Sequence, residues 1–319
     1  MSSTLSFDQC LQSPCDTCSA PCCTFLPLHD FVMQTFDDVD YARYLLNFAN
    51  IELAYVSGQT WRVHYVAPCS RLDKNGLCTL HGTVQKPQVC LNYNARSCFY
   101  QPMFLQPENT NFMRFDAERF EVLSKLLTFS DQGQLLELPS TEDLISQLPP
   151  FVFHPFEQID LPQTRYKGFQ TYGFTDLQSQ CEGCSAWCCQ TLSFPFGGIH
   201  AASNLDYIWF CLGFPNVELC VTEDSMSIFV HTRCRNLLST AFGGCGVFGT
   251  SKRPLVCERY DGMSCAYKAQ VGTEQSTSAV RVSVEDFAIF QEQFQFNGEG
   301  KVISQTPFTQ IRDAIYQAR

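Results

Sequence analysis

The sequence predicts an α+β fold made of two tandem homologous domains, each of them small and loop-rich. Three observations support this prediction: an eight-cysteine pattern that occurs twice, a repeat that extends well beyond the cysteines, and apolar residues that follow helix and strand periods in turn. We place the first domain at residues 1–150, a connector at 151–175 and the second domain at 176–319. With 319 residues, 45% of them hydrophobic, the chain has enough apolar material for two cores without disulfide staples.

Sixteen of the nineteen cysteines form two sets with nearly the same spacing, and each set opens on Cys-x-x-Cys-x-x-x-Cys-Cys. The first set is Cys15, Cys18, Cys22, Cys23, Cys69, Cys78, Cys90 and Cys98. The second set is Cys181, Cys184, Cys188, Cys189, Cys234, Cys245, Cys257 and Cys265. The three cysteines without a counterpart in the other copy are Cys10, Cys211 and Cys220. We predict that Cys211 and Cys220 are buried and act as ordinary hydrophobic side chains.

The repeat also includes residues that carry no sulfur, and it therefore indicates a shared fold. In the first copy these residues include Asp40, Tyr41, Glu52, Lys86, Pro87, Arg114 and Glu118. Their counterparts in the second copy are Asp206, Tyr207, Glu218, Arg253, Pro254, Arg281 and Glu285. The repeated unit is a whole domain of roughly 145 residues, which is an ordinary domain size.

The elements near the first cysteines follow from the apolar spacing. We expect each cysteine-rich opening to form an irregular loop that is followed by a helix, because residues 38–55 carry apolar side chains at helical spacing. Residues 61–66 alternate in the manner of a strand that leads into Cys69. Residues 227–230 do the same before Cys234. Glycine-rich loops then bring the later cysteines back to the earlier ones.

The end of each copy is predicted to contain two helices with a short strand between them. Asp116 and Ser283 are suitable N-caps for helices that end near residues 127 and 294. Short strands are expected at 135–138 and 301–303. The final helices carry apolar residues at helical spacing, namely Leu144, Leu148, Ile311 and Ile315.

Composition and charge exclude several classes of partner. The formal net charge is −11 and no basic stripe could neutralise phosphates, so we expect no nucleic-acid partner. The N-terminus lacks a secretory pattern and no stretch is long and apolar enough to span a membrane, so we expect a cytoplasmic protein without a membrane partner. In a reducing cytoplasm, repeated Cys-x-x-Cys spacings indicate metal more often than disulfides, which makes a disulfide scaffold the weaker interpretation.

All sixteen paired cysteines are candidate metal ligands. Sets of four soft thiolates suit either tetrahedral zinc or an iron–sulfur cluster, and the spacing does not distinguish the two. Eight cysteines per copy indicate two centres, or one centre with spare thiols. Adjacent cysteines such as Cys22 and Cys23 point in different directions in an extended chain, so they would serve different centres, or one of them would bridge.

The order of these residues resembles the YkgJ family of cysteine-cluster proteins, whose domain is described as chelating zinc or iron. The resemblance covers residues 15–98 and 181–265 and includes the basic residue and proline at Lys86-Pro87 and Arg253-Pro254. It implies a bound metal or an iron–sulfur cluster such as a 4Fe-4S cluster. Flagellin lysine N-methylase is similar in carrying a related cysteine motif with an iron–sulfur centre. This chain departs from the family pattern because the motif is duplicated in tandem.

Four basic residues are further candidates for the site. Lys86 and Arg253 each precede a proline close to a cysteine, so their charge could offset thiolate charge beside a bound cofactor. Arg114 and Arg281 could bind a cofactor or orient a substrate. The interpretation that we prefer for them is an exposed ion pair on a helix with the glutamates four residues later, Glu118 and Glu285.

His81 follows Cys78 by three residues and could act as a ligand in the first copy only. We interpret it as a polar loop or surface residue, because its counterpart in the second copy is Phe248. No phosphate-binding loop, dinucleotide fingerprint or nucleophile elbow occurs, and no catalytic residue is identified.

Three functions therefore remain open. The first is an iron–sulfur protein that acts as an oxidoreductase or modifies a protein, peptide or small-molecule substrate, and this is the function that we expect. The second is a structural or interaction module in which zinc contributes only folding energy. The third is a protein that stores or delivers zinc or iron through its thiolates.

Overall fold

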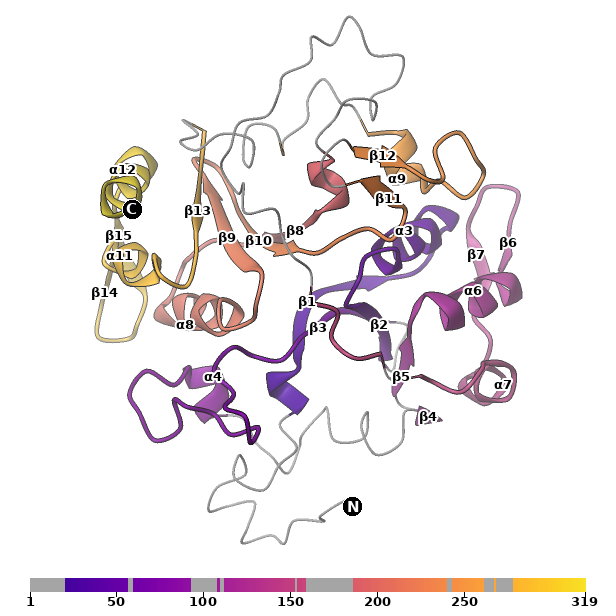
Figure 1. Cartoon of the computed structure of the whole chain (residues 1–319), viewed down its shortest axis with the longest axis horizontal. Coiled ribbons are helices and arrows are strands. Elements are labelled where there is room, and N and C mark those ends of the chain that lie inside the picture. The colour runs from indigo at the N-terminus through magenta and orange to yellow at the C-terminus, as the bar shows by residue number, and fades with distance from the viewer. Residues whose placement is uncertain are drawn as a thin grey trace, which may run out of the picture.

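The computed structural model describes residues 21–56, 60–92, 108–109, 112–152, 154–158, 186–239, 243–260, 267 and 278–319. These residues form a mixed α and β structure with small sheets, and the described residues before and after the connector are called the first and second halves below (Figure 1). No helix in these ranges is both long and apolar enough to cross a membrane.

The first half begins with a short 3-10 turn and continues through alternating strands and helices. Its elements are η1 (Pro21–Cys23), β1 (Phe25–Val32), α3 (Phe36–Leu46), β2 (Ile51–Val56), β3 (Thr60–Val66), α4 (Gln88–Leu91), β4 (Glu108–Asn109), β5 (Phe112–Phe115), α6 (Ala117–Leu126), β6 (Thr128–Phe129), β7 (Leu135–Glu137) and α7 (Thr141–Gln147).

The described elements of the second half follow the same order, except that the hairpin of β11 and β12 is added and β4 has no counterpart. Its elements are η4 (Trp187–Cys189), β8 (Thr191–Phe196), α8 (Ala202–Cys211), β9 (Val217–Thr222), β10 (Met226–His231), β11 (Leu237–Ser239), β12 (Gly243–Cys245), α9 (Leu255–Glu258), β13 (Ala279–Val282), α11 (Phe287–Gln291), β14 (Phe294–Phe296), β15 (Val302–Gln305) and α12 (Phe308–Ala318).

The main sheets of the two halves share four strands in the same order, and the first sheet has β4 in addition. The first has the strand order β1-β3-β2-β5-β4 and the second has the order β8-β10-β9-β13, with antiparallel pairing between neighbours. Asn50 and Asn216 precede the equivalent strands β2 and β9 and both adopt the left-handed conformation, with φ of 58° and 61°. Asparagine tolerates this conformation better than most residues, so the repeat preserves a local requirement of the backbone.

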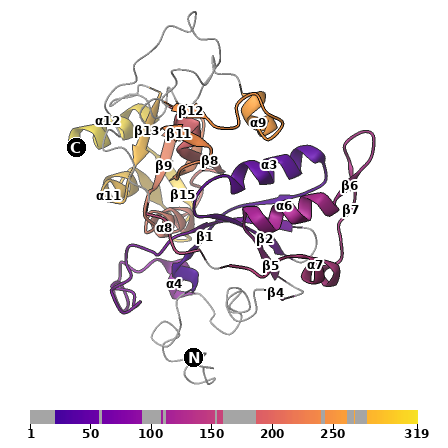
Figure 2. The same ribbon diagram turned by 45° about the vertical axis from the view of Figure 1, so that its right-hand side comes forward.

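Helices cover the sheets and join the two halves into one apolar core. In Figure 2, α3 and α6 lie side by side over the first sheet, and α8 packs against β9 in the second half. Large side chains from both halves, including Trp61, Phe48 and Phe214, are almost completely buried in a single connected cluster of apolar residues. The proposed division into two domains at 151–175 stays a prediction.

Several predicted elements are confirmed. The strands predicted at 61–66 and 227–230 are β3 and β10, and those at 135–138 and 301–303 correspond to β7 and β15. Asp116 caps α6, because its Oδ1 accepts the Arg119 N–H at 2.9 Å. The final helices are α7 and α12, and Cys211 and Cys220 are buried as predicted.

Three local predictions are wrong. The cysteine-rich segment leads first into strand β1, and only then into a helix. That helix, α3, ends at Leu46, and residues 51–55 belong to strand β2, because the left-handed Asn50 redirects the chain. Ser283 is not the N-cap of the helix that follows it, because α11 begins only after Asp286. The Asp286 carboxylate accepts hydrogen bonds from the backbone N–H and side-chain hydroxyl of Ser283 at 2.9 and 2.7 Å.

Candidate metal centres

The described cysteines of the first set come from four separate segments. Cys22 and Cys23 lie in η1, and Cys69 follows β3. The Cys69 N–H donates to the Cys23 carbonyl at 2.7 Å, which fixes these two segments together. Cys78 lies in the following loop and Cys90 lies on α4. The remaining members, Cys15, Cys18 and Cys98, lie outside the described residues.

The second set repeats this arrangement. Cys188 and Cys189 lie in η4, and the Cys234 N–H donates to the Cys189 carbonyl at 2.8 Å. Cys245 ends β12 and Cys257 lies on α9. The remaining members are Cys181, Cys184 and Cys265, which fall outside the part of the chain that the structure describes.

The thiols of each set lie within electrostatic reach of one another. Burial raises the pKa of Cys90 to about 12, and the nearby Cys22 and Cys69 add to this effect. Burial also raises the pKa of Cys257 to about 12, with further contributions from its partners Cys188 and Cys234.

In the described ranges, no group of three or more His, Cys, Asp or Glu side chains is arranged to hold a metal ion.

The adjacent cysteines of each set form unequal pairs. A hydrogen bond between the two thiols lowers the pKa of Cys22 and raises that of Cys23. Cys188 and Cys189 show the same division, again because of the hydrogen bond between them. Each pair thus holds a hydrogen bond in which one thiol stabilises the deprotonated form of the other, and the thiolate is the form that binds metal.

The predicted basic residues stand beside the cysteines of their own half. Lys86 is buried. The pKa of Cys22 is lowered mainly by its hydrogen bond with Cys23, and a backbone hydrogen bond and the charge of Lys86 lower it further. Its Nζ lies 3.2 Å from Nδ1 of His81, which is a contact between side chains of one loop. In the second half, the Arg253 guanidinium lies 4.5 Å from the centre of the Phe248 ring, and its Nη2 donates to the Cys257 carbonyl at 2.6 Å. Both halves therefore place a basic side chain against a ring at these positions. The contact is between lysine and histidine in the first half and between arginine and phenylalanine in the second.

Arg71 lies beside the first cysteine set, although no motif or recurrence in the sequence pointed to it. Its charge interacts with Cys69, Cys78 and Cys90, and its guanidinium carbon lies 3.6 Å from the centre of the Trp209 ring in the second half. Its Nη2 is buried and has no hydrogen-bond partner among the described residues. Arg71 has no basic counterpart, because Asn236 occupies the position two residues after Cys234.

Each cysteine-bearing helix is capped by a carboxylate from the other half. Asp40 on α3 accepts the Leu255 N–H of α9 at 2.6 Å through Oδ2. Asp206 on α8 accepts the N–H groups of Gln88 and Val89 of α4 at 2.7 and 3.0 Å. The loops after Cys69 and Cys234 also cross over, because Ser70 N–H donates to Gly213 and Arg235 N–H donates to Asn47, at 2.8 and 2.7 Å. Both cysteine sites are consequently built from both halves.

Tyr44 belongs to the first half and lies near cysteines of the second set. Its pKa is raised far above the usual value by burial and by the nearby Tyr267 and the thiols of Cys188 and Cys257. The tyrosine belongs to α3, and both cysteines belong to the second set. A phenol at this place could reach a group bound by the second set, and its counterpart at the same offset in the repeat is Phe210.

Arg114 and Arg281 do not form the exposed helical ion pairs that we preferred. Both lie on strands, β5 and β13, and are almost completely buried. The Arg114 Nη2 lies 2.6 Å from Glu52 Oε2, and Arg281 Nη1 lies 3.6 Å from Glu218 Oε2. The helical spacing was misleading because a strand ends between Arg114 and Glu118, so the true partners come from the neighbouring strand.

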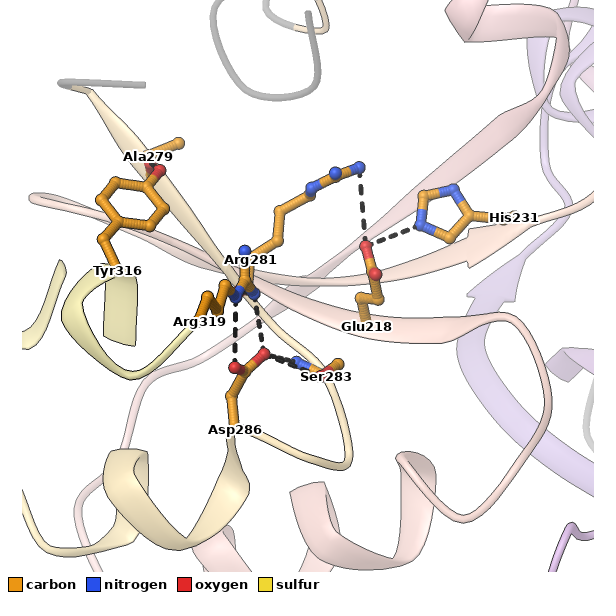
Figure 3. Close-up of polar contacts among 8 residues, drawn as sticks. All are labelled: Glu218, His231, Ala279, Arg281, Ser283, Asp286, Tyr316 and Arg319. Atoms are coloured by element: carbon orange, nitrogen blue, oxygen red, sulfur yellow. Dashed lines mark hydrogen bonds and ion pairs between the residues drawn. The ribbon is translucent and has the colours of Figure 1, made fainter. Parts of the chain in front are cut away.

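Figure 3 shows how the buried pair of the second half is extended by a histidine. Glu218 Oε2 also lies 2.9 Å from Nε2 of His231, whose Nδ1 lies 3.0 Å from the Thr191 hydroxyl. Arg319 donates hydrogen bonds to the Asp286 carboxylate and to the backbone carbonyl of Arg281 on strand β13. These contacts hold strand β13 against the sheet and leave Arg281 away from bulk solvent.

Comparison with known proteins adds no relative: no family model, curated protein or solved structure matches this chain.

Proposed function

We propose that the protein binds metal through its two cysteine sets, as iron–sulfur clusters, in two tandem domains that resemble the YkgJ family. The observation that carries this proposal is the convergence of cysteines from separate segments in both halves. In each half, the cysteine turn and the loop after the third strand are joined backbone to backbone, and the cysteine of the short helix lies within electrostatic reach of both. A repeat that preserves only the fold would not need to keep these sulfurs together.

The donor chemistry and its surroundings suit an anionic centre. The shared ligand candidates are all thiols, and a thiolate-bound zinc or iron–sulfur centre of four cysteines carries net negative charge. Lys86 and Arg71 lie beside the first set and Arg253 beside the second. A buried guanidinium nitrogen of Arg71 without a described partner is a donor that such a centre could satisfy.

A bound iron–sulfur cluster would supply electron transfer or activation of a protein, peptide or small-molecule substrate. The residues of the chain hold the thiolates, offset their charge and exclude water. Cytoplasmic thiols remain reduced, so a cytoplasmic location agrees with such a role. We propose an iron–sulfur-dependent oxidoreductase or modifying enzyme, with no nucleic-acid or membrane partner. Zinc in a structural module, or in a storage or delivery protein, is the alternative that the same ligands permit.

Anaerobic purification followed by iron, zinc and acid-labile sulfide analysis tests the proposal, with EPR and Mössbauer spectra to identify the centre. We expect iron and sulfide in the wild-type protein. Cys90→Ser and Cys257→Ser should each remove the metal of one set. Cys211→Ala is the matched control, because Cys211 is buried outside both sets and should leave metal content unchanged. Stoichiometric zinc without sulfide would establish the alternative, and metal content that no set cysteine affects would refute both.

A further inference from the structure

A groove of about 720 Å³ lies between the two halves beside the first cysteine set. The loop before α4 and helix α4 form one wall, and α8 with α11 forms the other. The neighbouring positions of α4 and α8 can be followed in Figure 1. Its volume falls within the range of small-molecule sites, and sites at the junction of two structural units are common.

The floor of the groove is fixed by a stack of three side chains. The Trp209 ring packs against Phe287, with centroids 4.9 Å apart and an angle of 22° between the planes. The Arg71 guanidinium lies over the same indole, and the indole Nε1 donates to the Gln85 carbonyl at 2.8 Å. The groove is therefore lined by residues that contacts across the two halves hold in place.

The groove carries positive charge on an acidic protein. Arg71 and Lys86 both line it, whereas the whole chain has a net charge of −11. Among the described lining residues the one carboxylate is that of Asp206, which already accepts two backbone hydrogen bonds from α4. The charges of the groove therefore favour an anionic group, and the exposed side chains of Val84 and Val284 offer apolar surface beside it.

Beside the second cysteine set, an ion pair spans the place that corresponds to the groove. There the Arg259 guanidinium reaches from the end of α9 to Asp37 at the start of α3, with an Nη1–Oδ2 distance of 2.6 Å. At the groove, the corresponding positions are Asn92 after α4 and Ser203 on α8, which are exposed, neutral and too short to form this bridge. Both of these residues line the groove. The repeat has thus diverged at these two positions.

We propose that this groove binds a small organic carboxylate with an apolar body, placing the carboxylate toward Arg71 and Lys86 and the apolar part against Val84 and Val284. This site goes beyond the proposed metal binding and does not depend on which metal the cysteines hold. It assigns ligand binding to the groove beside the first cysteine set, whereas the ion pair between Asp37 and Arg259 spans the corresponding place beside the second set.

Isothermal titration calorimetry of the full chain with octanoate and 3-phenylpropanoate tests the proposal. Octan-1-ol and octylamine are the matched probes, because they keep an apolar body and remove or reverse the charge. We expect saturable binding of the carboxylates and at least tenfold weaker binding of the other two. Equal affinity for octanol would reduce the groove to a nonspecific apolar surface and overturn the proposal. Absence of carboxylate binding would also overturn it.

The double variant Asn92→Arg with Ser203→Asp transfers the bridge of the second half to the groove. It should weaken octanoate binding at least tenfold while leaving the groove cations in place. The control adds the same two residue types at exposed positions of α7, as Ser146→Asp with Gln147→Arg, and should bind octanoate like wild type. Unchanged affinity in the double variant would refute the location.

Two further measurements keep this test independent of folding and metal content. Ser203→Asp alone places a carboxylate in the first turn of α8, where acidic residues are favourable, so it serves if the double variant does not fold. It should weaken octanoate binding by introducing a like charge, and unchanged binding would count against the groove. Metal analysis of every sample separates the two proposals, because the groove variants should retain the metal of wild type.

Discussion

Asp40 in the first half accepts the backbone N–H of Leu255 in the second half at 2.6 Å, two residues before Cys257. Asp206 performs the reciprocal role at α4, close to Cys90. The carboxylates belong to the recurring Asp-Tyr pair of the repeat. The recurrence therefore preserves a contact between the halves, in which each half positions a cysteine of the other.

Replacing one of these carboxylates should weaken the cysteine site of the opposite half. Loss of a cap of this kind costs about 0.5–2 kcal/mol. The proposed function leaves only the second set to bind metal in a Cys90→Ser background, and there Asp40→Ala should accelerate metal release to a chelator. Asp206→Ala should not, because it caps the helix of the disabled set. Chelator competition followed by absorbance measures the rates.

Two results would contradict this crossed dependence. One is an equal effect of Asp40→Ala and Asp206→Ala in the Cys90→Ser background. The other is an effect no larger than that of Asp131→Ala, an exposed turn residue that serves as the control. The same experiment in a Cys257→Ser background should give the reverse order.

Glu52→Gln should strongly destabilise the first half. Glu52 and Arg114 are both buried, with 2.6 Å between Oε2 and Nη2, and removing one member of a buried pair costs about 3–5 kcal/mol. Urea denaturation followed by circular dichroism measures the free energy of unfolding. Glu121→Gln is the control, because Glu121 pairs with Lys125 on the exposed face of α6 and should change stability by less than about 1 kcal/mol. Similar small effects of both variants would contradict the assignment.

His64 should make the protein less stable as the pH falls. Burial lowers the pKa of His64 from 6.5 to about 3, so between these values the folded protein binds fewer protons here than the unfolded chain. Stability is therefore lost as the pH drops below about 6.5, by up to about 1.4 kcal/mol per pH unit. Free energies of unfolding measured between pH 7 and pH 4 would show a shallower slope for His64→Gln.

Acid also protonates thiolates and releases metal, so this pH experiment compares chains with identical cysteines. His200→Gln is the matched control, because His200 is exposed and should leave the slope of wild type. An unchanged slope in His64→Gln would show that this histidine does not carry the acid dependence.

Arg71→Asn should weaken the first site and leave the second unchanged. The substitution removes a positive charge beside Cys69, Cys78 and Cys90 and supplies the residue that the second half has at this position, Asn236. We expect faster loss of metal from a Cys257→Ser chain and no change in a Cys90→Ser chain. Arg62→Asn removes the Arg62–Asp30 ion pair and is the control, because this pair lies on the sheet and not beside the thiols. Equal release rates with and without Arg71 would contradict its role.

The periodicity of the sequence identified several elements correctly and misjudged others for local reasons. Residues 61–66 alternate cleanly because one face of β3 is buried, and Asp116 is a cap that needs only its own helix. Arg114 was misassigned because its partner Glu52 is 62 residues away, and no local spacing reveals that pairing. The recurrence of glutamate at 52 and 218 was the available signal, but recurrence alone does not identify a partner.

The sequence by itself determined which residues recur, the order of most elements and the two sets of cysteines, because these are properties of spacing along the chain. The tertiary structure decided which half completes which site. Asp40 reaches α9, Arg71 packs on Trp209, and Tyr44 approaches the second set only because helices from both halves share one apolar core. Such contacts depend on the packing of residues distant in sequence, so the spacing of two copies along the chain does not reveal that each cysteine set is contacted by residues of the other half.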